Sequence, residues 1–304
     1  MKNLTPQKII RVSVGLSLFN EANNIAGVLR GILSQKPHGW ELNEILLYND
    51  GSTDATIQEI KKVKSPLIKL INDGNRKGKT FRLSQMFQDF SGDLLLMFDG
   101  DISFVGTDVI TRMAESFDDP KVMLVGGNST PFPPRNFFQK CVNTTFDVFY
   151  RSRKYIKDGN NIFGCTGSIL GIRNILAKKI TLPEIINEDA YIYLYCMSTG
   201  YAFAYQDNAK VLYMLPTNLR DYLRQAFRSH PEAVEIELKK YFGELVDKEF
   251  HRPLKFYVKS VLITFLKHPV EVISMVVIHM LCKPFYSIIS SRYKLSWFTA
   301  TSTH

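Results

Sequence analysis

The first 130 residues alternate between short apolar runs typical of strands and amphipathic runs typical of helices. Strands separated by single helices predict a mainly parallel sheet flanked by helices, because each right-handed crossover returns the chain in the same direction. In such an α/β fold, ligands bind beyond the carboxyl ends of the strands. Strands are predicted at residues 11–19, 44–48, 67–71, 94–98 and 122–127, and helices at residues 24–33, 55–63 and 80–90.

Two acidic residues interrupt the apolar stretch LLLMFDGDISF, residues 94–104. Asp99 and Asp101 directly follow a run that a strand covered on both faces would bury. Carboxylates at such a place repel each other and lose hydration unless a cation binds there. Mg²⁺ and Mn²⁺ prefer oxygen ligands and take the remaining ones from substrate phosphates. The pair therefore predicts a metal site, and an ordinary Asp-Gly turn that ends a strand is the alternative.

Polar residues also follow the second and third predicted strands. Asp50 in YNDGSTD could accept hydrogen bonds from a nucleotide base or ribose, whereas the Ser, Thr and Asp after it are explained as helix caps. The basic loop GNRKGKT contains Lys79 and resembles a phosphate-binding P-loop. It has one residue too few and follows the wrong strand, which disfavours an NTPase. A cationic loop near a pyrophosphate remains a reasonable interpretation.

Alternation of strands and helices fades after residue 136. Glu188 and Asp189 stand at a predicted helix start, where the helix dipole favours acids and where a carboxylate could also serve as a general base. Gln225 and Arg228 share one face of a later helix and suit a polar partner, although a solvated face would look the same. Helices are predicted at residues 136–156, 188–200 and 217–230, a turn and strand at 163–172, and a pair of strands at 201–213.

Basic residues gather at the C-terminal end of the chain, which has 304 residues and a formal net charge of +9. Residues 251–304 contain seven Lys or Arg and one acid, so the rest is close to neutral and does not predict a nucleic-acid-binding face. The four cysteines are far apart and form no paired metal motif, so they are expected to be buried free thiols.

The most apolar stretch is residues 257–282, which Lys267, His268, Pro269 and Glu271 interrupt. A simple transmembrane helix needs about 20 mainly apolar residues, and proline tends to break a helix. We expect two short helices that lie in the membrane interface or re-enter it, with basic residues near anionic lipid head groups. A buried packing helix and a true membrane span are the alternatives.

Seven motifs in order give the chain a resemblance to a known family. From about residue 11 to residue 230 the chain resembles the family 2 glycosyltransferases, which have the GT-A fold. It is most similar to the membrane-associated branch, which includes cellulose, chitin and hyaluronan synthases and ceramide glucosyltransferase. The resemblance implies a GT-A domain at residues 1–235 and a C-terminal amphipathic, membrane-associated helical segment at 236–304. The motifs are LSLFNEANNI, NDGSTD, KGKTFRLSQ, DGD, FGCTGS, NED and QAFRS.

The resemblance also implies roles for individual residues. Asp101 and Asp99 would bind a divalent cation, Mn²⁺ or Mg²⁺. Asp189 would be the catalytic base, and Glu188 is the alternative candidate for that catalytic role. The residues that would bind the donor nucleotide, its diphosphate or the acceptor end are Glu21, Asp50, Lys79, Asp99, Gln225 and Arg228.

The implied activity is inverting, metal-dependent transfer of a sugar from a nucleotide sugar, expected to be UDP-linked. The acceptor would be a lipid, a lipid-linked group or a saccharide at the cytoplasmic face of the membrane. The family motif Q-x-x-R-W ends in Trp, whereas this chain has Ser229, which favours a single sugar addition. The alternatives are a processive polysaccharide synthase of the same family, a nucleotidyltransferase and an inactive nucleotide-binding homologue.

Overall fold

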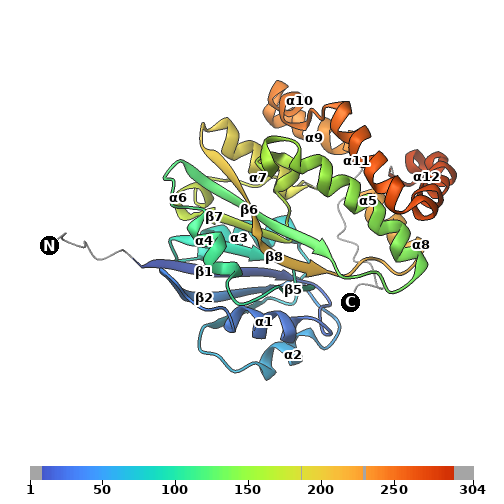
Figure 1. Cartoon of the computed structure of the whole chain (residues 1–304). Coiled ribbons are helices and arrows are strands. Elements are labelled where there is room, and N and C mark those ends of the chain that lie inside the picture. Colours follow the sequence, from blue (N-terminus) through green and yellow to red (C-terminus); the bar gives the residue numbers. More distant parts are fainter. Residues whose placement is uncertain (1–8, 186, 229–230, 291–304) are drawn as a thin grey trace.

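An eight-stranded mixed sheet forms the centre of the protein in the computed structural model, which describes residues 9–185, 187–228 and 231–290 (Figure 1). The strand order is β3-β2-β1-β4-β7-β6-β8-β5. The strands are β1 (Ile10–Leu18), β2 (Trp40–Asn49), β3 (Ile68–Asn72), β4 (Leu94–Phe98), β5 (Ile102–Phe104), β6 (Val122–Pro131), β7 (Ile169–Arg173) and β8 (Ala202–Tyr213).

Helices cover both faces of this sheet. The first seven are α1 (Ile25–Leu33), α2 (Thr56–Lys62), α3 (Lys79–Asp89), α4 (Val109–Glu115), α5 (Phe137–Lys154), α6 (Asn174–Ala177) and α7 (Glu188–Ser198). The remaining five are α8 (Leu219–Arg228), α9 (Pro231–Phe242), α10 (Glu244–Phe250), α11 (Leu254–Lys267) and α12 (Pro269–Ser290).

The parallel pairing predicted for the first half is confirmed. β1 pairs in parallel with β2 and β4, and β2 pairs in parallel with β3. The second half is mixed, because β7 runs antiparallel to both of its neighbours, β4 and β6, and β5 runs antiparallel to β8. The carboxyl ends of β1, β2, β3 and β4 therefore meet at one edge of the sheet.

The predicted pair of strands at 201–213 is wrong, because one long strand, β8, occupies this stretch. The polar residues in its middle suggested a turn, but they form an irregularity within continuous pairing to β6. Gly127 lies opposite Gln206, and the next residue, Asn128, lies opposite Lys210. The extra residues of β8 interrupt the regular register without reversing the chain. β5 and α4, which are short, were not predicted.

Alternate residues of β4 enter two separate apolar cores. Leu94, Leu96 and Phe98 join a cluster with α1, α2 and α4. Leu95 and Met97 join the other cluster, with α3, α6 and α7. All five residues are buried, which confirms that the apolar run is a strand covered on both faces.

The helix caps predicted after Asp50 are confirmed in part, because Asp54 Oδ1 accepts a hydrogen bond from the backbone of Thr56 (3.0 Å), the first residue of α2. Asn24 occupies the cap position of α1, but its side chain makes no cap hydrogen bond and instead donates to Glu21. Ser52 Oγ accepts a hydrogen bond from the backbone of Asn20 (2.9 Å), and Asp54 Oδ2 accepts one from the backbone of Ala22 (3.1 Å). These side chains therefore fasten the loop after β1 to the turn after β2.

The C-terminal helices lie on one side of the molecule, where α11 and α12 pack along α5 (Figure 1). The chain breaks between them at His268, as the following proline predicted. Within the described ranges, no helix combines the length and the apolar character needed to cross a membrane. The domain boundary expected at residue 235 falls inside α9, whose Val234 and Leu238 belong to the larger apolar core. Three cysteines, Cys141, Cys165 and Cys196, are buried and free, as expected.

Candidate active site

Gly100 allows the chain after β4 to pass close to the loop after β1. A Cβ atom at Gly100 would lie 2.8 Å from Leu18 Cδ2 and 2.8 Å from Glu21 Cγ, so a larger residue does not fit without displacement. Asp99 and Asp101, on either side, are held at the edge of the sheet by this contact. Glu21, which was expected to bind the nucleotide, is 7% exposed, and its side chain packs against Gly100.

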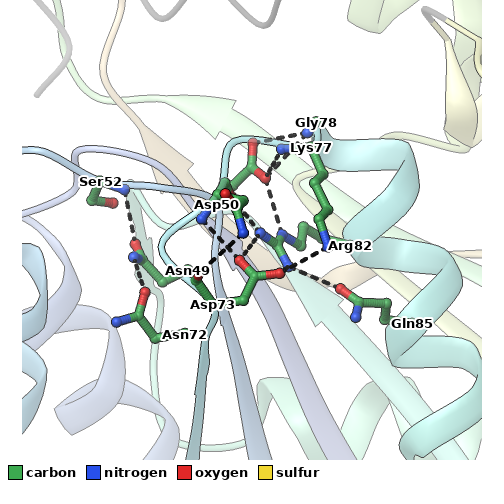
Figure 2. Close-up of polar contacts among 10 residues, drawn as sticks. Asn49, Asp50, Ser52, Asn72, Asp73, Lys77, Gly78, Arg82 and Gln85 are labelled. Atoms are coloured by element: carbon green, nitrogen blue, oxygen red, sulfur yellow. Dashed lines mark hydrogen bonds and ion pairs between the residues drawn. The ribbon is translucent and has the colours of Figure 1, made fainter.

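Asp50 follows β2 and is fully buried. Its carboxylate accepts hydrogen bonds from the backbone N–H groups of Lys77 (2.7 Å) and Gly78 (3.0 Å) and from Arg82 Nε (3.0 Å) (Figure 2). The equally buried Arg82 also donates through its two terminal nitrogens to Asp73, at 3.0 and 2.7 Å. Hydrogen bonds from this guanidinium hold the pKa of Asp73 well below its ordinary value. One buried arginine therefore joins two carboxylates.

This network fixes the basic loop of residues 74–78. The turn after β2 packs closely against the same loop, because a Cβ at Gly51, which has φ +73°, would lie 3.0 Å from Arg76 N. Asp50 thus organises the loop, and its contact with a nucleotide stays a prediction. The role of Arg82 was not predicted from the sequence. The available signal was its position on the buried face of α3, four residues before Met86.

Lys79, the first residue of α3, joins two elements of the site. Its ammonium lies 3.0 Å from Asp99 Oδ1 and 2.9 Å from Glu188 Oε1. Burial by itself lowers the pKa of Lys79, but the charges of Asp99 and Glu188 outweigh burial and raise the pKa above its ordinary value. Lys79 therefore stays charged and connects the end of β4 to the start of α7.

Asp189 is the second residue of α7. Its Oδ2 accepts a hydrogen bond from Gly167 N (2.9 Å) and its Oδ1 accepts one from Ala190 N (2.8 Å). Burial and the neighbouring charge of Glu188 raise the pKa of Asp189 to about 6, although Lys79 and the two backbone N–H groups act in the opposite direction. A carboxyl group with this pKa is ionised at neutral pH and is more basic than an ordinary aspartate.

Gly167, in the FGCTGS loop before β7, contacts two charged residues of the site, which was not predicted from the sequence. Besides binding Asp189, it lies against Lys79, since a Cβ at this position would be 3.1 Å from Lys79 Nζ. A side chain here would press on the ammonium group. The glycine therefore keeps the space beside both charged groups open.

A cavity of about 1080 Å³ brings most of the predicted residues together. Asp50 and Glu21 are not among the residues that line it, and the side chain of Arg228 lies outside the part of the chain that is described. α5, α8, β6 and β8 supply the opposite walls. The predicted site residues that line the cavity are Lys79, Asp99, Asp101, Glu188, Asp189 and Gln225.

Asp99 and Asp101 are the candidate metal ligands in this cavity. No group of three or more His, Cys, Asp or Glu side chains in residues 9–185, 187–228 and 231–290 is arranged to hold a metal ion. Two carboxylates nevertheless suit Mg²⁺ or Mn²⁺ when substrate phosphates supply the other oxygens. The donor set is therefore consistent with a cation that binds together with a phosphorylated substrate.

Residues 13–181, more than half of the chain, match the family described as Glycosyl transferase family 2. The chain belongs to glycosyl transferase family 2. It is therefore a glycosyltransferase, which confirms the predicted enzyme class and disfavours the nucleotidyltransferase alternative.

Two curated relatives are similar over most of the chain. The poly-beta-1,6-N-acetyl-D-glucosamine synthase of Staphylococcus aureus (strain MSSA476) is 26% identical over 243 residues, 77% of this chain and 57% of that protein. The N-acetylglucosaminyltransferase of Rhizobium meliloti (strain 1021) is 24% identical over 238 residues, 71% of this chain and 54% of that protein. The chain thus spans little more than half the length of these relatives.

Solved structures confirm the GT-A fold. The mannosyltransferase PcManGT from Pyrobaculum calidifontis, in complex with GDP-Man and Mn²⁺, has a TM-score of 0.59 and 16% identity, covering 93% of this chain and 79% of that chain. Glucosyl-3-phosphoglycerate synthase from Mycobacterium tuberculosis, in complex with Mn²⁺, UDP and glucosyl-3-phosphoglycerate, has a TM-score of 0.52 and 14% identity, covering 75% of this chain and 80% of that chain.

We predict that Arg82→Met lowers the free energy of unfolding by about 3–5 kcal/mol, because it leaves Asp50 as a buried charge without its counter-ion. Arg112→Met is the matched control and should cost much less, since the ion pair of Arg112 with Asp108 is partly exposed. Urea denaturation measures both variants. Equal losses would contradict the role given to the buried arginine.

Proposed function

We propose that this glycosyltransferase moves a sugar from a nucleoside diphosphate sugar, UDP-linked, to an acceptor hydroxyl with the help of Mn²⁺ or Mg²⁺. The observation that supports this most is the meeting of Asp99, Asp101, Lys79 and Asp189 in one cavity at the carboxyl ends of the strands. The similar solved structures that contain GDP-Man or UDP together with Mn²⁺ support the donor class.

The donor diphosphate would bind beside Asp99, Asp101 and Lys79. Asp99 and Asp101 would hold the divalent cation, with diphosphate oxygens as further ligands. When bound, this cation supplies positive charge that stabilises the leaving diphosphate. Lys79 is a charged group at the same place and can donate hydrogen bonds to phosphate oxygens.

Asp189 would act as the base. It would take the proton of the acceptor hydroxyl while the hydroxyl oxygen forms a bond to the anomeric carbon. The bond between that carbon and the donor phosphate oxygen breaks, and its electron pair leaves with the diphosphate. Attack from the face opposite the leaving group inverts the anomeric carbon. A pKa of about 6 suits this role, because Asp189 is ionised at neutral pH and still accepts a proton readily.

We predict that Asp101→Asn abolishes nucleoside diphosphate binding that depends on Mn²⁺ or Mg²⁺, because it removes one of two carboxylate ligands. Thermal shift with UDP, GDP and ADP, each with and without the metal, measures the effect. The control is Asp118→Asn, the same chemical change at an exposed position. Binding by Asp101→Asn equal to that of the parent would refute the metal site.

We predict that Asp189→Asn keeps donor affinity and lowers the transfer rate by roughly 10²–10⁴-fold, the range for a positioned acid or base. In the parent the rate should rise with pH through about 6, because only the ionised carboxylate accepts a proton. Initial rates between pH 4 and 9 measure this dependence.

Glu188→Gln is the comparison for the base. The negative charge of Glu188 in the parent raises the pKa of Asp189. Removing that charge should therefore move the midpoint of the pH–rate profile to lower pH while turnover persists. Parental turnover in Asp189→Asn, together with its loss in Glu188→Gln, would assign the base to Glu188.

A processive polysaccharide synthase is the second candidate, favoured by the synthase from Staphylococcus aureus among the relatives. We propose a single sugar addition instead, because Ser229 stands where the family motif has the Trp associated with stacking on an acceptor sugar. Ser229 itself lies outside the described residues. Product length decides between the two, since a ladder of sugars on one acceptor would refute single addition.

We also propose that α11 and α12 bind the cytoplasmic face of a membrane and thereby deliver a lipid or lipid-linked acceptor. Large apolar side chains on a surface favour contact with lipid or protein, and the neighbouring lysines Lys255, Lys259 and Lys267 are exposed and suit anionic lipids. The exposed apolar residues are Leu254, Tyr257, Val258, Leu262, Phe265, Leu266, Val270, Ile273, Val276, Val277, Met280 and Leu281.

We predict that the double substitution Leu266→Glu and Met280→Glu weakens cosedimentation with anionic vesicles, because it places charge on side chains that are 80% and 69% exposed. Binding of the parent should fall as salt rises, since salt screens the lysines. Ile236→Glu on α9, at a position 65% exposed, is the control and should bind as the parent does. Equal binding by all three proteins would refute the membrane proposal.

A further inference from the structure

One face of α5 forms a wall of the cavity. Asn143, Asp147 and Arg151 recur every fourth residue and therefore form one line along the helix. Tyr150 and Arg153 belong to the adjacent line, and all five residues border the cavity. α11 and α12 pack along the same helix (Figure 1), so α5 borders both the cavity and the exposed apolar helices.

The two arginines on this wall differ in their contacts. Arg153 is 2% exposed and donates to Tyr205 OH at 2.7 Å, and the rings of Tyr150 and Tyr205 each lie 4.9 Å from its guanidinium carbon. Arg151, by contrast, makes no hydrogen bond or ion pair through its side chain with any residue that the structure describes. The Nε–H groups of both arginines are buried and have no partner among the described residues. A buried N–H group without an acceptor is unfavourable. This wall of the cavity therefore has more hydrogen-bond donors than its described neighbours satisfy.

Arg151 shares the charge of Asp147, one turn earlier on α5, with two other basic residues. Lys79 already pairs with Asp99 and Glu188, on the donor side of the cavity. Asp147 is the acid that acts on Arg151, but burial raises the pKa of Asp147, and Lys267 and His268 compete for its charge. A second cation, Lys210 on β8, also borders the cavity, and it too makes no ion pair within the described residues.

We propose that Arg151, with Lys210, binds a phosphate group of the acceptor. This inference rests on the proposed function and names the class of its acceptor, a phosphomonoester or phosphodiester. An arginine presents a fork of N–H donors that matches phosphate oxygens, and a phosphate would satisfy the buried Nε–H of Arg151. The acceptor rather than the donor is assigned here, because the donor diphosphate belongs with Lys79, Asp99 and Asp101.

The same chemistry has two sources, a soluble phosphate ester and a lipid phosphate. Lys267 and His268, whose charges act on Asp147, form the junction of α11 and α12. No described residue of α11 or α12 is among those that line the cavity, so a lipid phosphate held at these helices would have to reach Arg151 around α5, whereas a soluble ester needs no such surface. Separate probes distinguish these sources.

The test uses the full chain with its donor site filled by Mn²⁺ and whichever nucleoside diphosphate stabilises it most. Calorimetric titration with inorganic phosphate and glycerol 3-phosphate should show saturable binding, which Arg151→Gln weakens about ten- to a hundredfold, as expected for charge-assisted hydrogen bonds. Arg151→Lys should retain part of the affinity because it keeps the charge. Arg30→Gln, at an exposed position on α1, is the matched control and should bind as the parent does.

Cosedimentation with phosphatidylcholine vesicles, with and without phosphatidic acid, tests whether Arg151 binds a lipid phosphate. A gain from phosphatidic acid that Arg151→Gln abolishes supports a lipid phosphate, and binding of the soluble esters without such a gain supports a soluble source. Vesicle binding that is independent of Arg151 reflects α11 and α12 alone and, without binding of the soluble probes, overturns the inference. Equal affinity of Arg151→Gln and the parent for every probe also overturns it.

Two further measurements keep the result separate from the proposed donor chemistry. Nucleoside diphosphate binding should be unchanged in Arg151→Gln, and the phosphate titrations are repeated without nucleotide, so they test Arg151 even if the donor proposal fails. Thermal melting verifies folding. If Arg151→Gln does not fold, Lys210→Gln takes its place, and parental affinity in that variant overturns the inference.

Discussion

A buried arginine between two carboxylates is the contact on which the rest of the site depends. Arg82 is enclosed at the start of α3, and burial of its charge is tolerated because Asp50 and Asp73 bind it from two sides. Asp50 also binds the backbone of residues 77 and 78, which fixes the point where α3 begins. The first residue of that helix is Lys79, so the position of its ammonium group follows from this buried ion pair.

Lys79 adds two further ion pairs, which lie at the cavity. By pairing with Asp99 after β4 and Glu188 at the start of α7, it joins the parallel first half of the sheet to the helix that precedes β8 in the mixed second half. Asp189 stands beside Glu188, and its pKa results from opposing effects of burial, a neighbouring acid, a neighbouring cation and two backbone N–H groups. The basicity of Asp189 therefore depends on contacts that come from three separate parts of the chain.

The sequence predicted most of the elements that build the first half of the fold, and most of the site residues that it predicted do line the cavity. The prediction of β4 as a buried strand was correct, because a strand covered on both faces leaves a clear pattern. β8 was predicted as two strands, since polar residues in the middle of a strand resemble a turn when the partner strand is unknown. The roles of Arg82 and Gly167 escaped prediction because each depends on a residue distant in the sequence.

By itself, the amino-acid sequence determined the alternation of strands and helices, the placement of acids at strand ends and the family, because local periodicity and motif order carry this information. Only the tertiary structure decided that Asp50 is enclosed by a loop, that Lys79 lies between Asp99 and Glu188, and that α5 presents to the cavity an arginine whose Nε–H has no partner among the described residues. Burial and charge pairing arise between residues far apart in the chain, and a side chain acquires its environment only when those parts pack together.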